Sequence, residues 1–224
     1  MITNYSENNH LVLMGKVVSE KMLSHEVYGE KFYLFNLEVP RLSETSDIIP
    51  ITISERLLTD IDIFVGKKAV IEGQFRSYNG YENEKSRLIL TVFAKEITVL
   101  PDEEELPISK ENVSNEVILS GYICKKPIYR QTPFKREIAD VLLAVNRAYN
   151  KSDYIPCIAW GRNARFVNSL QVGEKVTLLG RIQSRNYTKK HEDGTDEIKT
   201  AYEISISSIS LAENQDENST QEAI

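Results

Sequence analysis

Cysteine is scarce in this sequence of 224 residues: only Cys124 and Cys157 occur, and neither sits in a paired motif. A disulfide framework and a cysteine-based zinc site are therefore both disfavoured, and a reducing compartment fits. No apolar run approaches the roughly 18–20 residues that a membrane helix needs. Residues 1–7 contain no basic stretch leading into an apolar one, so no secretory signal is expected. These absences predict a cytoplasmic protein with no membrane partner.

Catalytic and metal-binding motifs are also missing. The three histidines, His10, His25 and His191, are scattered, and none has metal-ligand spacing to another histidine or cysteine. Residues 66–68 lack the upstream glycine of a phosphate-binding loop and are better explained as a turn into a strand. The sequence therefore predicts a protein that is not an enzyme and that needs neither a metal nor another cofactor.

Charge is unevenly distributed along the chain, whose formal net charge is −6. Residues 1–100 carry 11 Lys and Arg against 14 Asp and Glu, and residues 101–112 carry one against five. Residues 113–212 carry 15 against 10, whereas residues 213–224 carry none against four. One basic block thus lies inside an acidic chain, and this asymmetry favours an anionic partner for that block.

An internal repeat is the most informative feature. Residues 9–17 align with 115–123 at an offset of 106, and the same offset aligns 38–41 with 144–147 and 47–51 with 153–157. After one inserted residue, 65–68 align with 172–175. The offset is nearly constant over four blocks, which indicates a tandem duplication of a unit of about 100 residues.

Each unit has the alternating pattern of β-strands. The expected strands are 11–18, 32–39, 48–54, 69–77 and 88–100 in the first unit, and 117–123, 138–146, 154–160, 175–185 and 200–211 in the second. Helical spacing occurs between the third and fourth strands, at Leu57, Ile61 and Phe64 and again at Phe166 and Leu170. Five strands with a helix between strands three and four predict an all-β protein of two tandem OB-fold barrels, although a generic β-barrel without a ligand has the same element order.

The domain boundaries follow from composition. We expect a first OB-fold at 1–100, an acidic linker at 101–112, a second OB-fold at 113–212 and a disordered acidic tail at 213–224.

Aromatic side chains alternate with cations in the basic block. Tyr149 follows Arg147, Tyr154 precedes the third strand of the second unit, Trp160 lies near Arg162, and Tyr187 follows Arg185. Cations that contact phosphates, together with rings on which unpaired bases stack, are typical of a groove for single-stranded nucleic acid. No basic recognition helix for a duplex is present.

Residues 115–211 resemble the bacterial single-stranded DNA-binding protein (SSB) family. The matching segments are Asn115 with Gly121, Pro127 with 130–133, 143–149, 153–161 and 180–187. The resemblance implies base-stacking roles for Tyr149, Tyr154, Trp160 and Tyr187. The full candidate set for single-stranded DNA is Tyr149, Tyr154, Trp160, Tyr187, Arg147, Arg162, Arg185, Arg130 and Asn115.

The first unit has the same strand pattern as the second but lacks the stacking aromatic residues. The positions equivalent to the stacking aromatics are Ser43, Ile48, Ser54 and Gly80. We therefore expect the first unit to serve assembly or partner binding, with an isolated 1–100 fragment binding weakly and a 113–224 fragment retaining most of the binding. Equal binding by both fragments would instead indicate a second site with Tyr78, Tyr81, Lys67, Lys68 and Arg76.

The predicted function is largely sequence-independent binding of single-stranded DNA in replication, repair or recombination. Two alternatives stay open: a protein-interaction module in a primosome-like assembly, and binding of single-stranded RNA. The resemblance also implies a homodimer with four OB-folds in total. Recruitment of replication or repair proteins is in doubt because the tail ends in Ala223 and Ile224 rather than in an Asp-rich, aromatic-terminated tip. The sequence leaves a bacterial cytosol or nucleoid, a phage and a plasmid all open as its setting.

Overall fold

The computed structural model describes residues 8–41, 43, 45–82, 85–109, 113–190 and 194–212. The tail at 213–224 lies outside this range, as do the last three residues of the linker. The side chain of Tyr81 is also outside it.

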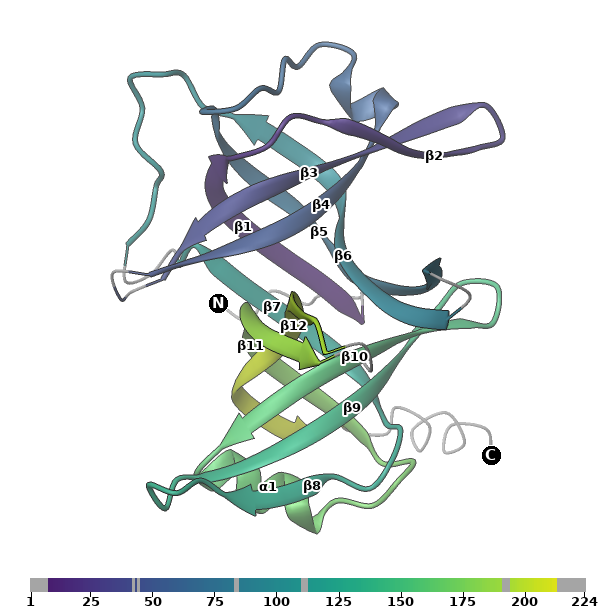
Figure 1. Cartoon of the computed structure of the whole chain (residues 1–224), viewed down its shortest axis with the longest axis vertical. Coiled ribbons are helices and arrows are strands. Elements are labelled where there is room, and N and C mark those ends of the chain that lie inside the picture. The colour runs from purple at the N-terminus through teal and green to yellow at the C-terminus, as the bar shows by residue number, and fades with distance from the viewer. Residues whose placement is uncertain are drawn as a thin grey trace, which may run out of the picture.

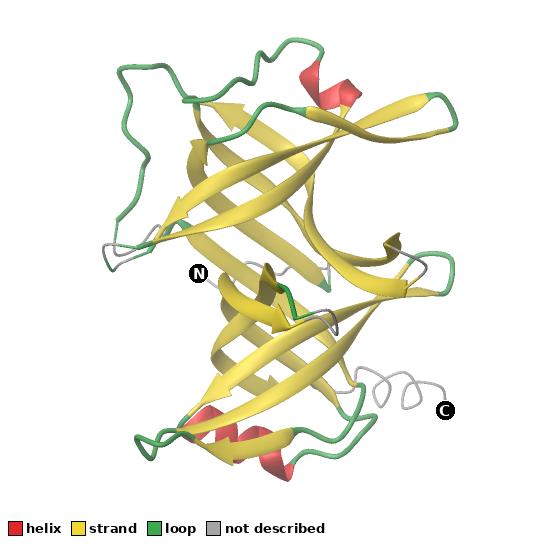
Figure 2. Ribbon diagram, in the orientation of Figure 1, coloured by secondary structure: helices red, strands yellow, loops and turns green. Residues whose placement is uncertain are grey.

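Twelve strands form two barrels stacked along the long axis of the molecule (Figures 1 and 2). The first barrel contains β1 (Asn9–Val17), β2 (Met22–Val27), β3 (Glu30–Pro40), β4 (Ser46–Ser54), β5 (Lys68–Glu82) and β6 (Lys85–Val99). The second contains β7 (Asn115–Ile123), β8 (Ile128–Gln131), β9 (Glu137–Arg147), β10 (Lys151–Trp160), β11 (Lys175–Lys190) and β12 (Asp196–Leu211). The predicted architecture of two tandem OB-fold barrels is confirmed.

Each predicted strand is present, and each barrel has one strand more than predicted. β2 and β8 are the two ends of the sheet, whose order is β2-β3-β4-β6-β5-β1-β7-β11-β12-β10-β9-β8. All six residues of β2 are exposed. An edge strand without a buried side does not alternate in polarity, so the sequence pattern did not reveal it.

The two predicted helical segments differ. In the second barrel, α1 (Arg162–Ser169) follows β10, with Phe166 packed against the core and Leu170 at its C-cap. In the first barrel a short 3₁₀ helix, Glu55–Leu58, occupies the predicted position, but Ile61 and Phe64 lie beyond its end. The residues that follow, Thr59 to Asp62, include β-branched and aspartate side chains that favour helices weakly, and Ile61 packs against the core without helical backbone.

Each barrel closes where two strands cross at a glycine. β1 pairs with β3 and β7 pairs with β9 at the closing points. A Cβ on Gly15 would lie 2.3 Å from the carbonyl oxygen of Glu38, and one on Gly121 would lie 2.6 Å from that of Ala144. Only glycine therefore allows this approach at both points.

The barrels join through β1 and β7, which pair antiparallel. Leu11 lies opposite Val117, and these two residues are equivalent in the repeat. Both are fully buried. The pairing therefore has a local pseudo-twofold axis at this point, and it makes one continuous sheet from both barrels.

The acidic linker contacts the first barrel on one side of the molecule (Figure 1). Lys67 forms an ion pair with Asp102 at 2.7 Å, and Lys68 forms one with Glu105 at 2.9 Å. Linker carboxylates therefore partly neutralise these two lysines.

Candidate nucleic-acid interface

β10 presents two of the predicted aromatic side chains on its outer surface. Asp153, Ile155, Cys157 and Ala159 point into the barrel and are 0–3% exposed, whereas Tyr154 and Trp160 are 44% and 41% exposed. Since side chains alternate along a strand, Tyr154 and Trp160 share the outer face. They are six positions apart, which corresponds to about 20 Å along the strand.

Neighbouring strands extend this outer face. Trp160 lies opposite Ile138 of β9, and Ile138 lies opposite Arg130 of β8, so the three side chains share one row. Arg130 donates to both carboxylate oxygens of Asp140 at 3.1 Å, which offsets part of its charge. At the other end of the face, Tyr122 of β7 lies in the row of Tyr154, because both lie opposite Ala144.

Tyr149 lies on the turn between β9 and β10. It adopts φ 60°, its neighbour Asn150 adopts φ 55°, and its side chain is 94% exposed. Two consecutive left-handed residues are typical of the tight turns that join antiparallel strands.

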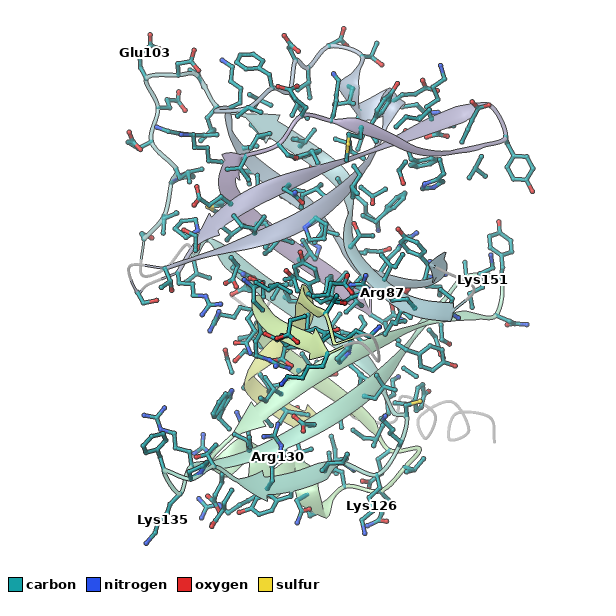
Figure 3. All side chains as sticks on the ribbon, in the orientation of Figure 1. Arg87, Glu103, Lys126, Arg130, Lys135 and Lys151 are labelled. Atoms are coloured by element: carbon teal, nitrogen blue, oxygen red, sulfur yellow. The ribbon has the colours of Figure 1, made fainter. Side chains whose placement is uncertain are left out.

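A hollow of about 750 Å³ lies beside this turn, and both barrels line it. The second barrel contributes Arg147, Tyr149 and Lys151, while the first contributes Arg76 and Lys95. The remaining lining residues of this hollow are all uncharged. The surface therefore combines four cations with one exposed aromatic ring. Figure 3 shows Lys151 at the end of the β9–β10 hairpin.

The hairpin of β11 and β12 presents Arg185 and Tyr187 on one side, two residues apart and both exposed. Tyr187 also lines a second hollow of about 450 Å³. Pro156 from the outer face of β10 lines it too, as do Tyr78 and Arg87 from the first barrel. Tyr187 is thus placed near the face that carries Tyr154.

Arg147 is positioned by a buried carboxylate. Its Nε lies 3.4 Å from Oδ2 of Asp153, and Asp153 in turn accepts a hydrogen bond of 2.7 Å from the backbone N–H of Ser77 in the first barrel. Burial raises the pKa of Asp153, and the Ser77 N–H and the charges of Arg147 and Arg76 do not fully compensate. The first barrel therefore helps to hold an arginine of the second.

The equivalent carboxylate in the first barrel, Asp47, has more partners. It forms a bidentate pair with Arg41 at 2.5 and 2.7 Å and accepts hydrogen bonds from both the backbone N–H and the hydroxyl of Ser184 in the second barrel. Burial acts to raise the pKa of Asp47, but these hydrogen bonds outweigh it and leave that pKa below its usual value. Two buried aspartates thus connect the barrels in a pseudo-symmetric way, one of them better paired than the other.

Asn115 has a role inside the barrel. Its side-chain amide donates to the carbonyl of Ile182 at 2.8 Å and accepts from the N–H of Ile182 at 2.9 Å. Its repeat equivalent, Asn9, forms the same two bonds with Phe75. The repeat therefore explains Asn115 as a link between neighbouring strands.

Cys157 does not have the environment of a nucleophile. Cys157 is buried, and burial raises the pKa of its thiol; Cys124 is a free thiol with intermediate exposure. Within the described ranges, no cluster of three His, Cys, Asp or Glu side chains could hold a metal ion. Among the same residues, no helix has the length and apolar character needed to cross a membrane.

The predicted site residues lie along an extended surface and not in one pocket. Tyr149 and Arg147 lie at the junction of the barrels, Tyr154 along β10, and Trp160 at the far end of that strand with the exposed Arg162 two residues beyond. Sequence reasoning missed Lys95, Arg87 and Tyr122, and it placed Arg76 only in an alternative site. The alternation of buried and exposed residues in strand 117–123 could have indicated that Tyr122 is exposed. The cations of the first barrel could not be predicted in this way, because contacts between the barrels bring them to the site.

Comparison with known sequences identifies relatives of the second barrel. A sequence model of the Single-strand binding protein family matches residues 114–212. The chain is 40% identical over 80 residues to Single-stranded DNA-binding protein 1 of Staphylococcus aureus (strain COL), covering 33% of this chain and 48% of the relative. It is 32% identical over 111 residues to Single-stranded DNA-binding protein 2 of Listeria monocytogenes, covering 46% of this chain and 67% of the relative. The chain spans about half the length of the first of these curated relatives.

A solved structure that matches most of the chain shows the same architecture. The wild-type single-stranded DNA binding protein from Thermus aquaticus superposes with a TM-score of 0.69 at 16% identity, covering 92% of this chain and 93% of that one, which shows a shared fold. The N-terminal domain of PriB protein from Thermoanaerobacter tencongensis is 57% identical, covers 42% of this chain and 99% of that chain, and has a TM-score of 0.38. On the family match and the Listeria relative, the chain belongs to the single-strand binding protein family.

Proposed function

We propose that this protein binds single-stranded DNA, largely without regard to base sequence, and acts in replication, repair or recombination without catalysing a reaction. The observation that carries the proposal is the outer face of β10, where Tyr154 and Trp160 are both partly exposed on a strand of the basic block. Curated relatives of the matching segment are named as single-stranded DNA-binding proteins, which supports the same conclusion.

The proposed contacts divide by chemistry. Tyr149, Tyr154, Trp160 and Tyr187 stack on unpaired bases, and stacking is sequence-tolerant because every base has a π-face. Arg147, Arg162, Arg185 and Arg130 contact phosphates along the same path. We leave Asn115 out of this set, because both polar atoms of its amide are bonded to Ile182.

A competition titration on the intact chain tests the proposal. A labelled thymidine tract of about 30 nucleotides, long enough for two OB-folds, is displaced by unlabelled single-stranded DNA, single-stranded RNA or duplex DNA of equal length. We expect single-stranded DNA of different sequences to compete similarly and the duplex to compete much more weakly. If four to six phosphates are contacted, the log–log salt slope is about −3 to −4. Equal competition by the duplex would contradict the proposal.

We also propose that two chains assemble into a homodimer in the bacterial cytosol, giving four OB-folds. Support comes from the two ends of the sheet, because β2 and β8 each have a neighbouring strand on one side only within the part of the chain that the structure describes. On β2, Met22 and Leu23 are 64% and 60% exposed, and an exposed apolar edge favours pairing with another chain. Light scattering is expected to give twice the chain mass of 25.6 kDa; a monomer at micromolar concentration would contradict this assembly.

A further inference from the structure

A cluster of aromatic rings lies on the first barrel, away from the positions equivalent to the stacking residues of the second. His25 of β2 stacks on Phe32 of β3, with ring centroids 4.9 Å apart and planes 8° from parallel. Phe32 lies 5.7 Å from Phe93 of β6, and the guanidinium carbon of Arg76 lies 4.3 Å from the centroid of Phe93. His25 is exposed, and the two phenylalanines are half-buried.

These rings border a hollow of about 390 Å³. His25, Phe93, Arg76 and Tyr78 line it from the first barrel, and Arg147 lines it from the second. The other lining side chains are the hydroxyls of Ser24, Thr52, Ser77 and Thr91. Asp153, which is fully buried, interacts electrostatically with both arginines. The hollow thus combines aromatic rings with two guanidinium groups, whereas the hydroxyls of Thr52 and Thr91 bond to each other and that of Ser77 accepts from the N–H of Tyr154.

This hollow continues into the hollow beside the β9–β10 turn. Arg76 and Arg147 line both of them, so a path leads from Tyr149 past the two arginines to Phe93 and His25. An anionic chain with flat unpaired bases matches this order of groups, because its phosphates meet the arginines and its bases meet rings at either end.

We propose that the first barrel carries a second subsite for single-stranded DNA, in which Phe93 and His25 stack bases while Arg76 and Arg147 hold the phosphates between the barrels. The inference rests on the proposed binding of single-stranded DNA by the second barrel and extends it across the junction. It differs from the expectation that the first unit serves assembly or partner binding and binds single strands only weakly.

The repeat could not reveal this subsite, because it uses different positions in the two barrels. β4 pairs with β6 at Ile51 and Val92, and β10 pairs with β12 at Cys157 and Ile204. Ile51 and Cys157 are equivalent in the repeat, so Val92 corresponds to Ile204. The next residue, Phe93, then corresponds to Ser205 in the second barrel. Comparing the two units at the positions of Tyr149, Tyr154, Trp160 and Tyr187 therefore does not detect the aromatic cluster of the first barrel.

Two variants of the intact chain, Phe93→Leu and His25→Ala, test the subsite directly. Leucine at position 93 keeps an apolar side chain in contact with Phe32 but removes the flat ring. We expect Phe93→Leu to weaken binding of a thymidine tract of about 30 nucleotides by about 5-fold or more, the lower end of the range for one stacked base. His25→Ala acts in the same direction. Phe64→Leu is the matched control: Phe64 is 44% exposed and has the Lys67 ammonium 4.9 Å from its ring centroid, but it borders neither hollow.

The charge contribution is measured by salt titration. Arg76→Gln and Lys95→Gln are each expected to reduce the magnitude of the log–log salt slope by about 0.7, the value for one phosphate of a single strand. Lys16→Gln, on the exposed side of β1, is expected to leave the slope unchanged. In every variant, quenching of Trp160 by a bound thymidine tract reports that the second barrel is intact.

The outcomes separate the two proposals. If the wild-type chain binds the tract and Trp160 is quenched, but Phe93→Leu and His25→Ala bind as tightly as wild type, the subsite is refuted and the proposed function stands. If the wild-type chain binds no single strand, the proposed function and the subsite are both wrong. A selective loss in these variants, with Phe64→Leu at wild-type affinity, supports the subsite.

Discussion

Trp160→Ala and Tyr154→Ala are each expected to weaken binding of a thymidine tract by about 1–3 kcal/mol, equivalent to about 5- to 150-fold in affinity. Both side chains lie on the outer face of β10, and their truncation removes a ring without opening a cavity in the core. The loss should be similar for tracts of different sequence, since stacking does not read the base edges.

Fluorescence anisotropy with a labelled tract measures this effect, and unfolding by urea checks that the variants are as stable as wild type. Phe64→Ala provides the control, because Phe64 has a comparable exposed fraction but lies outside the proposed path. Wild-type affinity in both folded variants would show that the single strand does not cross this face.

Asp47→Asn is expected to destabilise the folded chain by about 3–5 kcal/mol, the usual cost of breaking a buried ion pair by removing one partner. The substitution leaves Arg41 without its charged bidentate partner, and the single amide oxygen of asparagine cannot replace both carboxylate oxygens that bind Arg41 and Ser184. Asp153→Asn is the matched comparison at the equivalent position. Its effect should be clearly smaller, because burial already disfavours the charged form of Asp153.

The pH dependence follows from the opposite directions of the two pKa shifts. The pKa of Asp47 is lowered in the folded chain, so its stabilisation is present above the ordinary carboxyl pKa and is lost as the pH falls through the lowered value. The pKa of Asp153 is raised, so protonation of this group favours folding as the pH falls through the raised value. Urea unfolding at several pH values measures both effects. If Asp47→Asn and Asp153→Asn lost equal stability at neutral pH, Asp47 would not be the better paired of the two aspartates, which would contradict this interpretation.

Much of the fold was predictable from the sequence, because burial of one side of each strand imposes a period of two. Ile155, Cys157 and Ala159 alternate with Tyr154 and Trp160 in this way, and the strand and its exposed aromatics were both predicted. β2 has no buried side chain and was not detected. The helix after β4 is shorter than the apolar spacing indicated, because Ile61 lies beyond its end and is partly buried without helical backbone.

The junction of the barrels was the least predictable part of the site. Arg76 and Lys95 reach the hollow beside Tyr149 only because β1 pairs with β7 in the register that places Leu11 opposite Val117. The sequence of either unit contains no signal for that register, although two equivalent strands of a repeat can pair symmetrically.

The pairing of β1 with β7 also makes isolated fragments unsuitable for testing each barrel, because separating the barrels exposes the paired edges of both strands. Variants of the intact chain are therefore the better test of the contribution of each barrel.

The most direct test of the central claim is the fluorescence of Trp160 during titration with an unlabelled thymidine tract. Trp160 is the only tryptophan in the chain and is 41% exposed on the outer face of β10. If single-stranded DNA crosses this face, the fluorescence is quenched to saturation, the quenching is reversed by added salt, and duplex DNA at the same concentration has little effect. Binding of the tract, shown by anisotropy, without any change in Trp160 fluorescence would place the DNA elsewhere on the molecule and contradict this account.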